Sequence, residues 1–84
     1  MAKISFVKAQ QDLEEACTFL RAFTLGRTGF TRKDGIVGIQ RVKAQCDRLE
    51  KLFGSGPNAR KSATMVASAR PRVLAAEARL ALLH

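Results

Sequence analysis

Residues 31–53, TRKDGIVGIQRVKAQCDRLEKLF, carry the clearest helical pattern in the chain. Their apolar side chains recur three or four residues apart, as Ile36, Ile39, Val42, Cys46, Leu49 and Phe53. This spacing forms one stripe along an α-helix, whereas Arg41, Arg48 and Lys51 fall on the opposite side. A step of about 3.5 residues also suits extended contact with other helices. We therefore predict an amphipathic helix over about 31–53.

The start of this helix carries a capping signal and two weak points. Thr31 suits the N-cap position, and Asp34, three residues later, can complete a capping box. Gly35 and Gly38 weaken the first turns by about 1 kcal/mol each relative to alanine. Such glycines either allow another backbone to approach closely or are simply tolerated, and the sequence leaves both interpretations open.

Upstream, a second amphipathic pattern predicts a helix over about 8–25. Its apolar members are Ala9, Leu13, Ala16, Cys17, Leu20 and Phe23, and its polar side carries Glu14, Glu15, Thr18 and Arg21. Acidic residues lie in its N-terminal half, where the helix dipole favours negative charge. Gly26 and Gly29 then end the pattern, because glycine readily takes the positive φ of a helix terminus.

Downstream, residues 54–58, GSGPN, indicate a linker. A third apolar stripe predicts a helix over about 60–83, with Met65, Val66, Ala69, Val73, Ala76, Leu80 and Leu83 as its members. Pro71 interrupts this helix, because proline lacks an N–H and disfavours α geometry at the residue before it. Either the helix kinks at Pro71, or a short helix ends there and a fourth helix begins.

These segments indicate an all-α fold in a single domain over residues 1–84. We predict a small bundle of three helices, or four if Pro71 divides the last one, built from a helical hairpin and a Pro-interrupted C-terminal helix. A chain this short has a thin core. We therefore expect self-association as a homodimer.

The first residues leave strand and helix open. Lys3-Ile4-Ser5-Phe6 alternates polar and apolar side chains, which fits a short strand or the lead-in to a helix. Together with the helix, the glycine turn and Thr31-Arg32-Lys33-Asp34, the order over residues 3–48 resembles a ribbon-helix-helix repressor. That resemblance implies a paired strand whose Lys3 and Ser5 enter the major groove of DNA. The long first helix and the glycines of the second depart from the family's usual form.

Charge is the strongest functional signal in the sequence. Fifteen Lys and Arg oppose seven Asp and Glu, for a net charge of +8. Basic and acidic residues cancel within residues 1–26, so the whole excess lies in residues 27–84. Such a chain repels itself, and an anionic partner would relieve the repulsion. The alternative is a basic surface that serves solubility alone.

The basic residues fall into two candidate nucleic-acid-binding surfaces. One is the loop and second helix, with Arg27, Arg32, Lys33, Arg41 and Arg48. The other follows the third helix, with Arg60, Lys61, Arg72 and Arg79. The planar guanidinium of arginine suits phosphate groups and guanine edges, so these surfaces favour DNA as the anionic partner.

Catalytic and metal-binding patterns are missing from the sequence. The single histidine, His84, stands at the end, so no His pairs with Ser or Cys to activate a nucleophile. Cys17 and Cys46 are too few for a zinc site, and we predict two buried free thiols. No apolar run reaches the roughly 18 residues of a membrane span. We expect a cytoplasmic protein that is not an enzyme, with no cofactor, no metal, no small-molecule substrate and no membrane association.

These features favour a small dimeric DNA-binding protein, such as a regulator or accessory factor of the plasmid or phage type. It would contact phosphate groups and base edges through Arg and Lys. The alternative is a protein-interaction module, an adaptor or an inhibitor of a larger protein, that docks one helical face. Two features of the third helix favour this alternative. Its many alanines suit close helix packing, and Leu74 and Leu82 lie off its main apolar stripe.

Overall fold

The computed structural model describes residues 4–83. Over that range the chain forms three helices, α1 (Phe6–Thr24), α2 (Arg32–Phe53) and α3 (Ala59–Leu82), and no strand. The all-helical bundle predicted from the sequence is therefore confirmed. The expectations that concern Lys3 and His84 lie outside the described residues.

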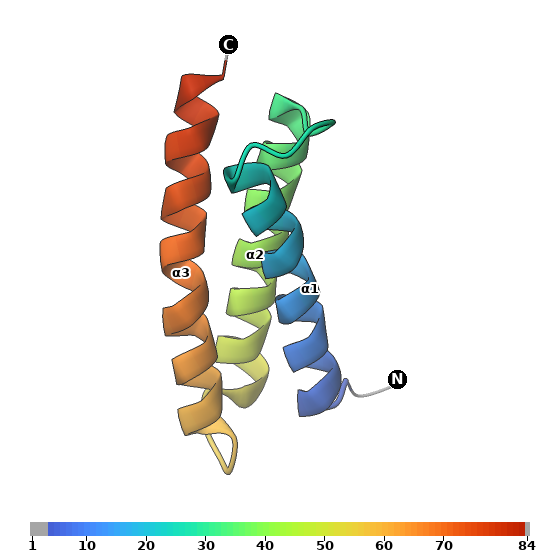
Figure 1. Ribbon diagram of the computed structural model, residues 1–84. Coiled ribbons are helices and arrows are strands. Elements are labelled where there is room, and N and C mark those ends of the chain that lie inside the picture. The colour runs from blue at the N-terminus through green and yellow to red at the C-terminus, as the bar shows by residue number, and fades with distance from the viewer. Residues whose placement is uncertain (1–3, 84) are drawn as a thin grey trace.

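The three helices form an elongated bundle. α2 runs antiparallel to α1 and to α3 (Figure 1), and the principal extents are 43 × 24 × 15 Å. Near the α1–α2 turn, α1 lies closer to α3, and the two helices diverge toward the N-terminus of α1 (Figure 1). The α1–α2 turn and the end of α3 thus share one end of the bundle, and the α2–α3 turn lies at the other.

The core lies where the three apolar stripes meet. Its buried side chains are Ala9, Leu13, Ala16, Leu20 and Phe23 from α1, Ile39, Val42, Cys46 and Leu49 from α2, and Val66, Ala69, Val73 and Ala76 from α3. Removing such side chains from water is the main stabilising contribution to a small fold. The start of α3 is also tied to α2, because the buried Ser62 hydroxyl donates a hydrogen bond to the Leu49 carbonyl at 3.1 Å.

The two glycines near the start of α2 are buried and make room for side chains of α1. A Cβ added at Gly35 would lie 2.3 Å from Cζ of Phe23, and one added at Gly38 would lie 3.1 Å from Cδ1 of Leu20. The glycines therefore admit an aromatic ring and a leucine, and not a second backbone. Because α2 turns this glycine edge toward α1, Ile36 is 38% exposed. The prediction that Ile36 belongs to the buried apolar stripe is therefore wrong.

The N-terminal residues of α1 are explained by a cap that the sequence pattern did not reveal. The Ser5 hydroxyl accepts a hydrogen bond from the Lys8 N–H at 3.1 Å, so the helix begins at Phe6, earlier than predicted. Residues 4–6 are consequently not a strand, and the ribbon-helix-helix interpretation is wrong for the described part of the chain. At α2, the predicted capping box between Thr31 and Asp34 is confirmed.

α3 continues through Pro71 as one helix, so Pro71 does not divide it into two. Core residues lie on both sides of the proline, with Val66 before it and Val73 after it, and this packing holds the interrupted turn in place. Pro71 and Ala67 are both on the exposed side of the helix. Water can therefore hydrate the Ala67 carbonyl, which loses its usual N–H partner.

Candidate functional site

Arg79, near the end of α3, lies against the turn between α1 and α2. Gly26 in this turn has a φ of +73°, and a Cβ placed there would lie 2.9 Å from Nη2 of Arg79. The Nε of Arg79 is buried and has no hydrogen-bond partner among the described residues. Arg27 follows Gly26 directly and is exposed. The turn therefore brings Arg27 and Arg79 to the same end of the bundle.

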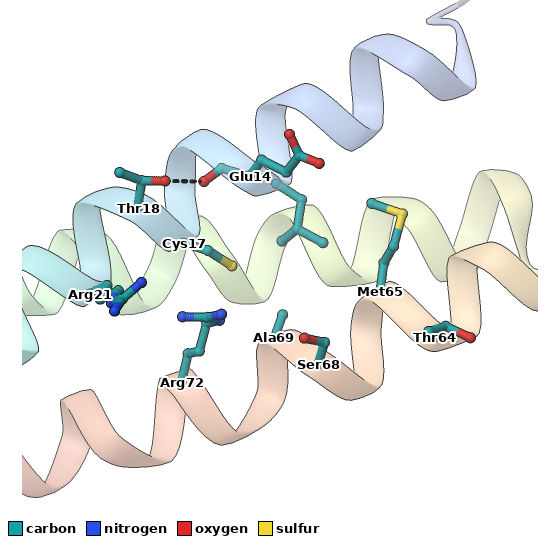
Figure 2. A pocket seen from close by; sticks show the side chains of 10 residues that line it. Glu14, Cys17, Thr18, Arg21, Thr64, Met65, Ser68, Ala69 and Arg72 are labelled. Atoms are coloured by element: carbon teal, nitrogen blue, oxygen red, sulfur yellow. Dashed lines mark hydrogen bonds between the residues drawn. The ribbon is translucent and has the colours of Figure 1, made fainter.

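A second pair of arginines lies between α1 and α3. Arg21 is near the end of α1. Arg72 is on the same edge of α3 as Arg79 and lies about 10 Å from it along the helix axis, toward the start of α3. Figure 2 shows both guanidinium groups in the space between the two helices. They line a groove of about 550 Å³. We call Arg21, Arg27, Arg72 and Arg79 together the arginine seam.

The ion pairs of the described residues leave this seam free. They are Lys8–Asp12 at 3.1 Å, Arg48–Asp12 at 3.1 Å, Lys43–Glu77 at 3.9 Å and Arg70–Glu50. The hydrogen bond from Lys8, together with the contact from Arg48, holds the pKa of the Asp12 carboxyl below its usual value of 3.8. No arginine of the seam takes part in these ion pairs, although the Glu14 side chain lines the same groove.

The structure does not assemble the two basic surfaces that were predicted from the sequence. Arg48 is bound to Asp12, and Arg41 lies on the α1–α2 side, with its Cζ 5.9 Å from the ring centroid of Phe19. Both arginines thus contact side chains of α1, although Arg41 is also exposed.

The remaining predicted residues divide between the two ends of the bundle. Arg32 and Lys33 are exposed in the first turn of α2, at the end that holds Arg27 and Arg79. Arg60 and Lys61 begin α3 at the opposite end, so they do not join Arg72 and Arg79 in one cluster. The antiparallel hairpin causes this separation, because it places the two interhelical turns at opposite ends of the molecule.

Arg21 is the seam residue that the charge count missed. Its charge cancels against the acidic residues of the first 26 positions when the sequence is summed. In three dimensions the cancellation fails, because Asp12 pairs with Arg48 of α2 while Arg21 faces α3. The spacing of residues could have located Arg21, since Glu14, Thr18 and Arg21 lie three and four residues apart and therefore share one edge of α1.

Both cysteines are free thiols, as the sequence predicted, although Cys46 is buried and Cys17 only half-buried. Burial raises the pKa of both thiols, and the charge of Arg72 partly opposes this at Cys17. Both side chains are therefore neutral at neutral pH. Residues 4–83 contain no group of three or more His, Cys, Asp or Glu side chains placed to hold a metal ion. No helix in that range combines the length and apolarity needed to cross a membrane.

Comparisons with protein-family models, with curated proteins and with solved structures find no match for this chain. The fold and the site define, over the described residues, a small three-helix bundle with an arginine seam that takes part in no ion pair. Its function is therefore inferred from these residues alone.

Proposed function

We propose that this protein binds DNA through the arginine seam, as a small regulator or accessory factor of the plasmid or phage type. One observation supports this function above the others. Arg21 and Arg72 line the groove between α1 and α3, Arg27 and Arg79 lie at the adjoining end of the bundle, and none of the four is ion-paired among the described residues. Guanidinium groups bind phosphate through short, charge-assisted and often bidentate hydrogen bonds. Phosphate contacts of this kind supply nearly all of the non-specific affinity for DNA.

The dimensions of the seam suit the DNA backbone. Arg72 and Arg79 are separated by about 10 Å along α3, which is comparable with the width of the major groove, about 12 Å. Arg32 and Lys33 are exposed at the same end of the bundle as Arg27 and would reach neighbouring phosphates. Contacts between guanidinium groups and guanine edges would add a preference for sequence.

We propose that the protein acts as a homodimer in the cytoplasm, with the outer face of α3 as the interface. Leu74 is 67% exposed and Leu82 is 69% exposed, and they lie on one face with the exposed Ala67, Ala75 and Ala78. Small residues allow two helices to approach closely, and the leucines supply apolar surface to bury.

The binding of a labelled DNA duplex by the wild-type protein tests this function. We expect a complex at micromolar protein and about 50 mM salt in a mobility-shift assay. Four phosphate contacts predict that the affinity falls about a hundredfold when the salt rises to about 200 mM, because each contact releases condensed counterions. The absence of a complex at the lower salt, or an affinity that does not change with salt, would contradict the proposal.

The exposed face of α3 also favours the second candidate function, a protein-interaction module that docks a larger protein there. The mass in solution distinguishes the two, with Leu74→Lys as the test variant and Leu52→Lys, at an exposed position of α2, as the matched control. If the protein is a homodimer, the wild type and the Leu52→Lys control should have the mass of a dimer, and the Leu74→Lys variant should have the mass of a monomer. The interaction module predicts a monomeric wild type that retains one stoichiometric protein after nuclease treatment, and a Leu74→Lys variant that does not retain it. Neither interface exists if Leu74→Lys changes nothing.

A further inference from the structure

The groove between α1 and α3 combines an apolar floor with a cationic end. Its apolar lining is Leu13, Cys17, Met65 and Ala69 (Figure 2). Because the Cys17 thiol is neutral at neutral pH, it contributes to this floor as an apolar group. Arg21 and Arg72 lie together toward one end. The volume of about 550 Å³ is within the range of small-molecule sites, about 300–1,000 Å³.

Two of the three hydroxyl groups that line the groove already have hydrogen-bond partners, and the third belongs to Ser68. The Thr18 hydroxyl donates to the Glu14 carbonyl at 2.9 Å, and the Thr64 hydroxyl donates to the Arg60 carbonyl at 3.0 Å. The carboxylate of Glu14 points away from α3 (Figure 2). The two guanidinium groups are therefore the charged groups available to recognise a ligand, and they select a negative charge.

We infer that this groove binds a small anionic amphiphile, a carboxylate head on an alkyl chain of medium length. The head group lies between Arg21 and Arg72, and the chain follows Leu13 and Met65 along the floor. From Leu13 to Arg21 the groove extends about 12 Å along α1, which accommodates a medium-length chain. Binding of this ligand does not depend on the DNA-binding function, and its test uses the protein without DNA.

Titration of the full, isotopically labelled chain with sodium decanoate, below its micellar concentration, tests the inference by NMR. We expect saturable shifts of amide signals confined to residues 13–21 and 64–72. Acetate, which lacks the chain, and decyltrimethylammonium, which carries the opposite charge, should each bind at least tenfold more weakly. Those two comparisons separate recognition of the head from recognition of the chain.

Variants of the two arginines assign the head-group site. Arg21→Gln and Arg72→Gln should each weaken decanoate binding about tenfold, because each removes a charge-assisted hydrogen bond. Arg60→Gln is the matched control, since it removes one positive charge from α3 outside the groove and should change the affinity less than twofold. Equal weakening by Arg60→Gln and Arg72→Gln, shifts spread over the whole bundle, or equal binding of the cationic amphiphile would overturn the inference. Thermal unfolding followed by circular dichroism checks that each variant remains folded.

Discussion

Replacing Phe23 with alanine is expected to lower the free energy of unfolding by about 3–5 kcal/mol. Phe23 is 1% exposed and its ring occupies the space above Gly35 in α2. An 84-residue domain has a total stability of only about 4–13 kcal/mol, so the cavity would remove a large part of it. Because the chain has no Trp and no Tyr, urea unfolding is best followed by far-ultraviolet circular dichroism. Val7→Ala, at a position of α1 that is 60% exposed, is the control and should change the stability by no more than about 0.5 kcal/mol.

A second variant tests whether the Phe23 ring requires a glycine at position 35. In the wild type, Gly35→Ala should destabilise the protein by about 1–3 kcal/mol, because the added methyl group collides with the Phe23 ring. In the Phe23→Ala background the same change should stabilise the protein by about 1 kcal/mol, since alanine favours the helix and fills part of the cavity. This reversal of sign measures the coupling between the two positions. If Gly35→Ala stabilises both backgrounds equally, the packing of α1 on α2 described here is wrong.

Much of the fold was predictable because the pattern that forms each helix is local. The apolar stripe of α2, the glycine turn after α1 and the capping box at Thr31 all depend on residues a few positions apart. The first turn of α1 was predicted less well, since Ser5 caps the helix but lies within a stretch that also alternates like a strand. Pro71 was misleading in a different way. Its local preference is overridden by tertiary packing, with Val66 and Val73 buried on either side.

The site was harder to predict, because it depends on which helix edges face each other. Arg48 reaches Asp12, 36 positions earlier in the chain, and is thereby neutralised. Arg21 and Arg72 meet only because the α1 and α3 edges that carry them adjoin. Composition gives the sum of the charges, whereas the rotation of each helix in the bundle determines which charges remain unpaired. A charge count along the chain therefore found the excess of basic residues but not its location.

The seam should account for most of the salt-dependent affinity for DNA. We expect the variant Arg21→Gln/Arg27→Gln/Arg72→Gln/Arg79→Gln to lose about 3 to 4 from the slope of log affinity against log salt, because each phosphate contact contributes about 0.9. The matched control removes the same number of positive charges from outside the seam, as Arg41→Gln/Lys51→Gln/Arg60→Gln/Lys61→Gln. Since the control residues lie on other parts of the bundle, its slope should fall by no more than about 1. If loss of Arg79, which is partly buried, unfolds the quadruple variant, the triple variant that retains Arg79 should lose about 2 to 3.

The most direct measurement is therefore the salt dependence of duplex binding by the wild type, the seam variant and the control, compared side by side. A slope that falls steeply in the seam variant and little in the control is the predicted result. Equal losses in the two variants would show that the DNA responds to total charge alone, and would contradict a binding surface formed where α1 and α3 meet.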